Sequence, residues 1–339
     1  MSASIFCFGE LLFRMSPLMH RGWIKQASLP VYIGGAELNV ATALASWEHA
    51  VKYCTALPPN YLSEDVLTDI QEKGIDVSAV HLSGNRIGIY FLPQGADLKN
   101  SGVIYDRAHS AFSDLKPGTI DWHKHLQHCS WFHFSAISPA LNENVAAVCK
   151  EALQAATDLR LFISVDLNYR SKLWQYGKSP LEVMPDLVRH CDGIMGNIWA
   201  ANSLLGIPVD ESIHENGSKE NYLRHAAITS QLIQEQYPKC KWVANTFRFE
   251  DAGGLKYYAA LNNKGNQYIS PEFTTNIIVD KVGSGDCFMA GLIHGFSNGE
   301  PAQSIINFAA AAAFGKLHET GDATRQTIQQ VNQTIASHA

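Results

Sequence analysis

The sequence has no long hydrophobic run, no basic stripe and no paired cysteine motif. Its longest uninterrupted apolar stretch, Phe308 to Phe314, is far too short to span a bilayer. Acidic residues outnumber basic ones, 32 to 26, for a net charge of -6, which argues against nucleic-acid binding. The seven cysteines are scattered without a Cys-x-x-Cys pair, a pattern typical of reduced, mostly buried thiols. The N-terminus lacks a basic segment and turns polar too early for a signal peptide, so we expect a cytoplasmic location.

What remains is the composition of a globular enzyme. At 339 residues and 46% hydrophobic, the chain can bury one large core. It contains no internal repeat, no low-complexity tract and no linker that would separate two domains. We therefore predict a single domain over residues 1–339, with any smaller lobe formed by insertions in it.

Strand-like and helix-like segments alternate along most of the chain. Strands are predicted at Ser4–Phe8, Val51–Ala56, Cys129–Phe134, Leu161–Val165, Gly193–Met195 and Lys241–Ala244. Helices are predicted at Ala36–Trp47, Ser63–Lys73, Asn142–Ala155, Leu181–Arg189, Tyr222–Gln236, Ser284–Phe296 and Pro301–Lys316, with a terminal helix from Thr324. This alternation predicts a parallel sheet covered by helices on both faces. A hairpin around Asn262–Gly265 is predicted to join Leu255–Ala260 to Gln267–Ile269.

Two segments, 11–33 and 86–107, do not follow the alternation. Their short apolar and aromatic runs, such as Ile87–Leu92 and Val103–Tyr105, indicate strands with no helix between them.

The run Asp280-Lys281-Val282-Gly283-Ser284-Gly285-Asp286 stands directly before a helical apolar pattern. Two glycines around a small serine predict a helix start whose unpaired N–H groups point outward, which is an anion site. Asp286 would repel a bound phosphate, so its presence indicates work on a proton beside that phosphate. A base next to amides that stabilise a phosphoryl group is what phosphoryl transfer to a hydroxyl requires. The alternative is an aspartate that merely caps the helix.

A second glycine motif, Gly34-Gly35-Ala36-Glu37-Leu38-Asn39-Val40-Ala41, lies near the other end of the chain. In this order, the two motifs resemble the N-terminal and C-terminal signatures of the PfkB/ribokinase family of sugar kinases. That family usually reads Asp-Thr-x-Gly-Ala-Gly-Asp, so Lys281 and Ser284 are departures. The resemblance covers essentially the whole chain.

The resemblance implies a ribokinase-like three-layer α/β sandwich with a central, mostly parallel sheet and a small β lid. The lid would consist of residues from about 11–33 and 86–107, cover the acceptor, and form the interface of a homodimer. The implied cofactors are ATP and Mg2+. Asp286 would be the catalytic base, and the amides of Gly283, Ser284 and Gly285 would stabilise the transferred group. A lid makes physical sense, because transfer to a hydroxyl must exclude water.

Two arginines indicate an acceptor that carries a carboxylate. Arg107 follows Tyr105-Asp106, and Arg170 ends the run from Asp166, just after a predicted strand, where ligands bind in such folds. A planar guanidinium can hold a carboxylate bidentately; a surface ion pair is the alternative for either residue. Together with Gly9-Glu10, these runs look most like the 2-keto-3-deoxygluconate kinases of the family. That resemblance places around the acceptor Gly34, Asn39, Tyr90, Tyr105, Arg107 and Arg170.

For the nucleotide, the resemblance implies Asn168, Asn197, Thr246, Arg248 and Asn307. Thr246 and Arg248 follow a predicted strand. Asn307 precedes the alanine-rich stretch Ala309–Ala313, whose small side chains would let an adenine approach, or simply allow close helix packing.

One departure from the family pattern concerns the metal. The family usually carries Asn-x-x-Glu, whose acid helps to organise Mg2+, but here Ala200 stands three residues after Asn197. Asp166, Asp280 or another acid could replace it, so the sequence assigns no metal ligand.

The resulting prediction is an ATP-dependent kinase of 2-keto-3-deoxygluconate. Two alternatives stay open. One is a kinase for a neutral sugar such as fructose or ribose. The other, suggested by Ala200, is a catalytically weakened protein that binds sugar or nucleotide.

Overall fold

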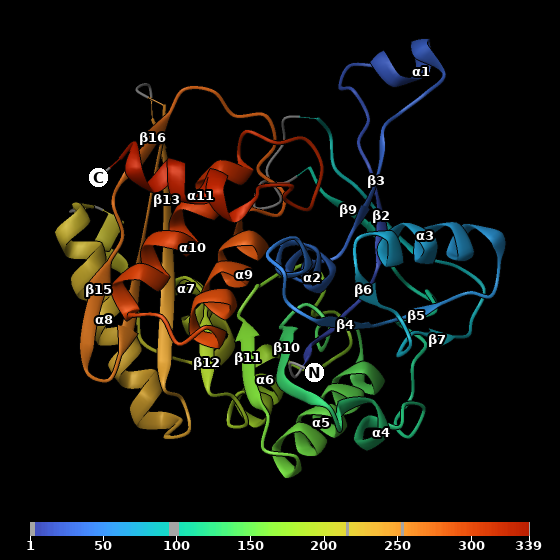
Figure 1. Ribbon diagram of the computed structural model, residues 1–339. Helices are drawn as coiled ribbons and strands as arrows, with labels where there is room; N and C mark the ends of the chain where they lie inside the picture. Colours follow the sequence, from blue (N-terminus) through green and yellow to red (C-terminus); the bar gives the residue numbers. More distant parts are fainter. Residues whose placement is uncertain (1–3, 95–101, 215–216, 252–253, 339) are drawn as a thin grey trace.

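The computed structural model describes residues 4–94, 102–214, 217–251 and 254–338 (Figure 1). Its strands are β1 (Ser4–Phe8), β2 (Leu12–Met15), β3 (Val31–Gly34), β4 (Val51–Cys54), β5 (Ala56–Leu57), β6 (Ile75–Asp76), β7 (His81–Leu82), β8 (Gly88–Phe91), β9 (Ile104–Asp106), β10 (Cys129–Ser135), β11 (Phe162–Asp166), β12 (Gly193–Met195), β13 (Trp242–Asp251), β14 (Gly254–Asn263), β15 (Asn266–Ile269) and β16 (Phe273–Thr275). Its α-helices are α1 (Gly22–Gln26), α2 (Ala36–Ser46), α3 (Tyr61–Glu72), α4 (Trp122–Leu126), α5 (Glu143–Asp158), α6 (Pro180–Val188), α7 (Ile198–Leu205), α8 (Lys219–Gln236), α9 (Ser284–Ser297), α10 (Ala302–Lys316) and α11 (Ile328–Ala336).

The main sheet runs in the order β15-β14-β13-β12-β11-β10-β1-β4-β6, with β16 paired to β14. The strands from β13 to β6 are parallel, and β14 to β16 add an antiparallel edge. This confirms the predicted α/β fold with a mostly parallel sheet. The strand order reverses at β1, which lies between β4 and β10, and ligands bind at the carboxyl ends of strands beside such a reversal.

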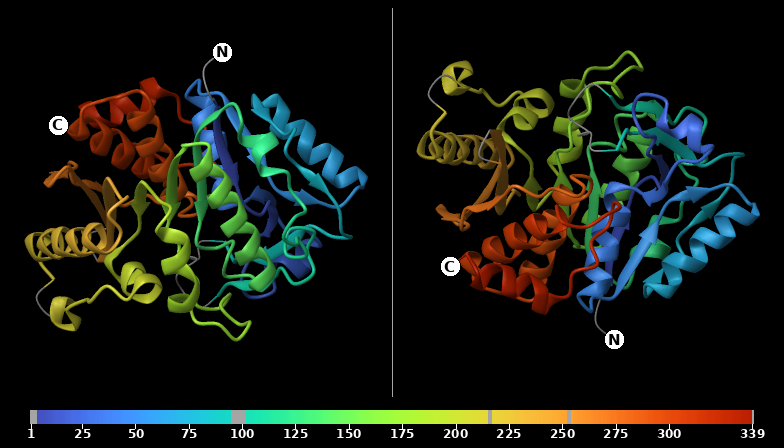
Figure 2. Two further views of the ribbon diagram at one scale, coloured as in Figure 1. Left: turned by 90° about the horizontal axis from the view of Figure 1, so that it is seen from below. Right: turned by 90° about the horizontal axis from the view of Figure 1, so that it is seen from above.

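Helices cover both faces of this sheet, so the molecule has three layers (Figures 1 and 2). Alternate residues of β1 enter different cores because successive side chains of a strand point to opposite faces. Ile5 and Cys7 join the core that contains residues of α2, α9 and α10. Phe6 and Phe8 join the core that contains residues of α4, α5 and α6.

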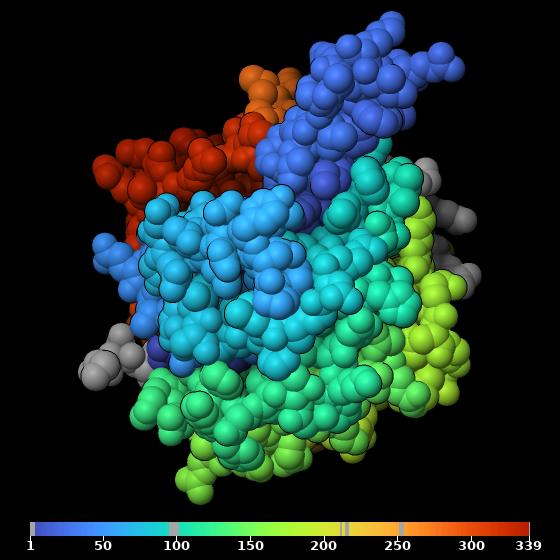
Figure 3. All heavy atoms as spheres, turned by 90° about the vertical axis from the view of Figure 1, so that its right-hand side faces the viewer, coloured from blue at the N-terminus to red at the C-terminus, as the bar shows by residue number. Residues whose placement is uncertain are grey.

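The lid is a separate four-stranded sheet in the order β3-β2-β8-β9. Its strands come from the two segments that the sequence set apart, and the predicted lid is confirmed. The prediction of no helix in residues 11–33 is wrong, because α1 forms between β2 and β3. This short helix has no buried residue and stands at the tip of an arm that projects from the body (Figures 1 and 3).

Most predicted elements lie within a few residues of their observed bounds. The hairpin is confirmed, and its turn at Lys264 and Gly265 has positive φ at both residues. The largest difference is β13, which was predicted to end at Ala244 but continues to Asp251 because it pairs with β14 over its whole length. Within the described residues, no helix is both long enough and apolar enough to cross a membrane.

Candidate active site

The start of α9 depends on glycine. Gly283 precedes the first helical residue with a φ of 78°, and a Cβ there would lie 1.7 Å from the main-chain oxygen of Asp322. Only glycine fits both this conformation and this close approach. Because α9 begins at Ser284, the N–H groups of its first turn have no partner within the helix and form the positive end of its dipole.

Asp286 lies in this first turn with 9% of its surface exposed. The Nδ2 of Asn39, on α2, donates a hydrogen bond of 2.7 Å to its Oδ2. Burial raises the pKa of Asp286 to about 7; the hydrogen bond from Asn39 opposes this shift and Glu37 adds to it. A carboxylate with such a pKa can accept a proton and release it again near neutral pH.

A cavity of about 700 Å3 contains Asp286 in its lining. The carboxyl ends of β11 and β12, the start of α2, the lid and the loop before α9 contribute to it. It brings together most residues predicted from the sequence: Asn39, Tyr90, Tyr105, Arg107, Asn168, Arg170, Asn197, Thr246, Arg248, Gly283, Ser284, Gly285 and Asp286.

Two predicted residues do not line this cavity. Gly34 is buried at the end of β3, where a Cβ would lie 2.4 Å from the Oδ2 of Asp322. Asn307 lies on α10, accepts a hydrogen bond from Gln303, and lines a smaller cavity with His294 and Glu300. Gly34 therefore leaves room for the side chain of Asp322. Asn307 does not lie with the other residues predicted to bind the nucleotide.

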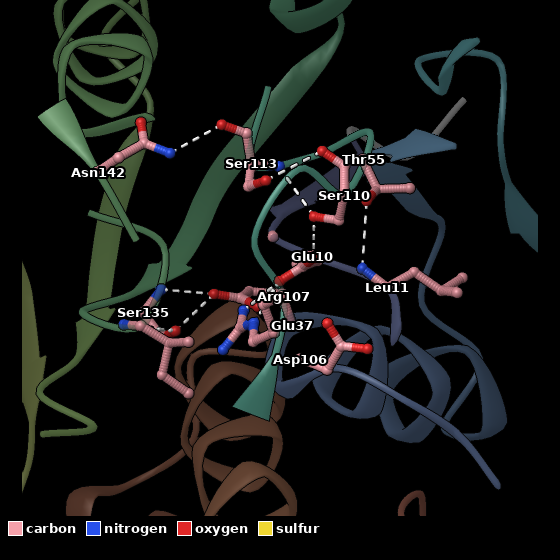
Figure 4. A network of polar contacts seen from close by, with 12 residues as sticks. Glu10, Leu11, Glu37, Thr55, Asp106, Arg107, Ser110, Ser113, Ser135 and Asn142 are labelled. Carbon is pink, nitrogen blue, oxygen red and sulfur yellow. Dashed lines mark hydrogen bonds and ion pairs between the residues drawn. The ribbon is translucent and has the colours of Figure 1, made fainter. Parts of the chain in front are cut away.

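Arg107 is buried rather than on the surface, and it already has a partner (Figure 4). Its guanidinium forms an ion pair with Glu10 at 2.5 Å, and Ser110 donates a hydrogen bond to the other oxygen of the same carboxylate. The charge of Arg107 is therefore largely offset within the protein. This arrangement fixes the guanidinium in one orientation at the cavity wall.

Glu37 is a second buried carboxylate in the lining. Its Oε1 accepts hydrogen bonds from the main-chain N and the Oγ of Ser135 (Figure 4). Burial raises the pKa of Glu37, and the bonds from Ser135 and the charge of Arg107 oppose the shift. Hydrogen-bonded carboxylates such as these are suitable acceptors for sugar hydroxyls.

Arg170 differs from Arg107 in having no carboxylate partner among the described residues. Its Nη1 donates to the main-chain oxygen of Tyr169 at 3.1 Å, and its side chain is half-buried. Its charge lowers the pKa of Asp286, so the two side chains share one region of the cavity. Arg170 is thus a cation that an anionic ligand could neutralise.

The other end of the cavity is formed by α7, β13 and the loop before α9. Asn197 caps α7, because its Oδ1 accepts from the N of Ala200 at 2.8 Å. Ala200 is 4% exposed and lines the cavity. Lys281 also lines it and forms an ion pair of 2.7 Å with Glu250 on β13. Arg248 is a second cationic side chain in this part of the lining.

Comparison with known proteins identifies the family. The family model described as pfkB family carbohydrate kinase matches residues 2–231 and 255–328. The chain belongs to this family. It is therefore a carbohydrate kinase, a phosphotransferase with an alcohol as acceptor, and kinases of this family use ATP.

Its relatives include kinases of several related sugar acids. A solved 2-dehydro-3-deoxygluconokinase from Thermotoga maritima is 33% identical, with 99% of each chain covered and a TM-score of 0.88. A 2-dehydro-3-deoxygalactonokinase from Haloferax volcanii is 28% identical over 99% of this chain and 97% of its own. A 5-dehydro-2-deoxygluconokinase from Geobacillus thermodenitrificans is 23% identical over 94% of this chain and 88% of its own.

Several cavity residues of this kinase were not singled out as site residues in the sequence. Glu10 and Glu37 stand in the motifs Gly9-Glu10 and Gly34–Ala41, so their position was a usable signal. Asp322 also lines the cavity and accepts a hydrogen bond from the hydroxyl of Tyr90. In the sequence it lies after the last predicted motif, and no motif marks it. Only the fold brings it to the site.

The described residues contain no group of three or more histidine, cysteine, aspartate or glutamate side chains placed to hold a metal. Asp280, one acid that could have replaced the missing glutamate, is instead paired with Arg14 at 2.6 Å. Asp166 and Asn168 offer oxygen atoms in the cavity lining. These donors fit a Mg2+ ion that is held mainly by phosphate oxygens and water.

Proposed function

We propose that this kinase transfers the γ-phosphoryl group of ATP to the terminal hydroxyl of 2-keto-3-deoxygluconate. The observation that carries the proposal is Asp286, a buried carboxylate with a pKa of about 7, in the first turn of α9. Asp286 takes the proton of the attacking hydroxyl. The amides of Gly283, Ser284 and Gly285 stabilise the charge on the transferring group, because the helix start presents aligned N–H dipoles to it.

The acceptor is assigned from charge. Arg170 lines the cavity and has no carboxylate partner among the described residues. A carboxylate on the acceptor could therefore form an ion pair with its guanidinium. Glu10 and Glu37 accept hydroxyls, and Arg107 donates to a carbonyl or hydroxyl oxygen. The names of the relatives support a dehydro-deoxy sugar acid without selecting one isomer.

A neutral sugar is the second candidate acceptor. The ion pair between Arg107 and Glu10 favours it, because only one of the two arginines predicted to bind a carboxylate remains uncompensated. A protein that binds without turnover is the third reading, and it rests on Ala200. The buried, hydrogen-bonded Asp286 argues against it.

Mg2+ would lower the negative charge of the nucleotide phosphates when bound. We assign Asp166 and Asn168 as the residues that would hold this ion, because both line the cavity, whereas Asp280 does not and is paired with Arg14. Thr246, Arg248 and Lys281, which also line the cavity, would bind the phosphates. Arg248 and Lys281 would supply part of the positive charge that the metal ion otherwise brings to the phosphates.

We also propose that the kinase is a homodimer that associates through its lid. One apolar row crosses the lid sheet, since Val31 lies opposite Met15, Met15 opposite Phe91, and Phe91 opposite Ile104. Val31 and Ile104 are 53% and 64% exposed, and Met15 and Phe91 are not buried either. A contiguous apolar row of this kind on a sheet surface is typical of an interface.

The test is ADP release from ATP and Mg2+ with a panel of acceptors: 2-keto-3-deoxygluconate, 2-keto-3-deoxygalactonate, fructose, ribose and gluconate. Asp286→Asn is run alongside each. We expect turnover on one or both keto-deoxy acids only, and none in the variant. Turnover of a neutral sugar alone would show that the acceptor is a neutral sugar. Nucleotide binding without turnover of any acceptor would favour the binding protein.

A further inference from the structure

Arg14 is a buried arginine of the lid. It lies on β2, its side chain is 4% exposed, and its guanidinium carbon is 4.3 Å from the centre of the Tyr32 ring. Its Nη2 lies 2.6 Å from the Oδ2 of Asp280, and its Nε lies 2.7 Å from the Oδ1 of Asp322. One lid side chain thus joins two carboxylates that belong to the C-terminal part of the chain.

Both carboxylates belong to the loops that shape the start of α9. The N–H groups of Val279 and Asp280 donate to the main-chain oxygen of Leu317, so the loop before α9 is bonded to the loop after α10. The Oδ1 of Asp280 accepts from the N of Val282 at 3.1 Å. The main-chain oxygen of Asp322 lies directly against Gly283.

Acidic side chains outnumber basic ones in this region. The acids are Asp280, Asp322 and Glu319, and the cations that face them are Arg14 and Lys316, a fully buried lysine whose Nζ donates to the main-chain oxygen of Glu319. Burial raises the pKa of Asp322, and the charge of Arg14 opposes the shift. Without Arg14, Asp322 would keep Lys316 as the cation that acts on it among the described residues.

We propose that Arg14 is a positioning residue for phosphoryl transfer. Its charge neutralises Asp280 and Asp322, so that a phosphate can bind at the start of α9, and its two ion pairs hold the lid against the loops that build this start. The proposal rests on the anion site assigned under the proposed function. It goes beyond that function, because one lid side chain, Arg14, determines both the position of the lid and the charge beside the phosphate.

The test is a pair of substitutions that separates charge from packing. Arg14→Met removes the arginine partner of the buried Asp322 and the partly buried Asp280, so we expect ATP binding and kcat/KM to fall by about 100-fold or more. Adding Asp280→Asn removes one of those charges while its Oδ1 can still accept from the N of Val282. The double variant should therefore regain about 10-fold or more over Arg14→Met.

The matched control is Arg86→Met. Arg86 is also a lid arginine, but its side chain is 35% exposed and paired with Asp106 at 2.8 Å, so we expect less than about a twofold change. Arg14→Lys keeps the charge and should retain most of the ATP affinity. A merely structural role for Arg14 predicts additive losses in the double variant, and that result would overturn the proposal.

ATP affinity is measured by calorimetry without acceptor, together with thermal unfolding of each variant. The ATP affinities can be compared even if no acceptor in the panel is turned over. Failure of the proposed function can therefore be distinguished from failure of the proposed role of Arg14. If Arg14→Met does not fold, the ATP affinity of the single variant Asp280→Asn tests the proposal. This variant should bind ATP as tightly as the wild type or more tightly, whereas weakening of about 10-fold or more would overturn the proposal.

Discussion

At the scale of single residues, the site depends on carboxylates that are buried but not fully paired. Asp286 receives one hydrogen bond from Asn39 and lies near Glu37 and Asp322, which both raise its pKa. Such a group costs free energy in the folded state, because its charged form is poorly solvated. Under the proposed function, activity and stability therefore oppose each other at this position.

This opposition gives a prediction for Asp286→Asn. The folded pKa is raised from 3.8 to about 7, so the unfolded chain binds fewer protons between these values and stability falls as pH rises through them. Asparagine cannot ionise and still accepts from Asn39. We expect the variant to be more stable than the wild type at pH 8 by at most about 4 kcal/mol, and equal to it near pH 4. Denaturant unfolding at the two pH values measures this, and a destabilised variant at pH 8 would contradict it.

Arg170 gives a second prediction at this scale. Arg170→Met should lower kcat/KM for the keto-deoxy acid by about 100-fold or more, because an arginine–carboxylate pair in a cavity is lost. Any residual turnover of a neutral sugar should stay nearly unchanged. Arg189→Met, at an exposed arginine paired with Asp186, is the control. Equal losses for both acceptors would show that Arg170 does not recognise a carboxylate.

The sequence predicted the residues that stand in local motifs. Gly283 and Asp286 were singled out because their spacing and residue types predict an anion site beside a base, and Asn39 because its motif resembles that of the family. Arg14 was missed because its partner Asp280 lies 266 positions away in the chain. Glu10 was noted only as part of a motif, and its pairing with Arg107 depends on how the lid folds over β1.

At the scale of secondary-structure elements, the start of α9 is the most constrained point. Residue types set where this helix begins, whereas the length of β13 could not be predicted because it depends on pairing with β14. The helix α1 was missed since none of its residues is buried and no periodic pattern marks it.

The start of α9 predicts the effect of Gly283→Ala. A Cβ would meet the main-chain oxygen of Asp322 in a left-handed conformation, so the loop must move. We expect kcat to fall by about 100-fold, as for loss of an oxyanion-hole donor, with a small change in the Kd of the acceptor. Gly299→Ala is the control, because its φ is 69° but a Cβ there meets no atom within 4 Å. Equal kinetic losses in the two variants would refute the explanation.

At the scale of the whole molecule, the lid joins the two ends of the chain and presents an apolar row on its surface. The dimer and the cytoplasmic location stay predictions. We expect Val31→Lys combined with Ile104→Lys to shift the protein from dimer to monomer, which light scattering would measure. Ile228→Lys, at a 49% exposed site on α8, should leave the mass unchanged. A wild type that is monomeric at micromolar concentration would contradict the interface.

The pH dependence of kcat/KM tests the central claim most directly, because it reports the ionisation of the base in the free enzyme. With saturating ATP and Mg2+ and the best acceptor of the panel, kcat/KM should rise about tenfold per pH unit below a pKa of about 7 and then level off. Asp286→Asn should show no such rise and should have lost activity by several orders of magnitude. A wild-type profile that is flat from about pH 5 to 9, or a variant that keeps substantial activity, would contradict the role of Asp286 as the base.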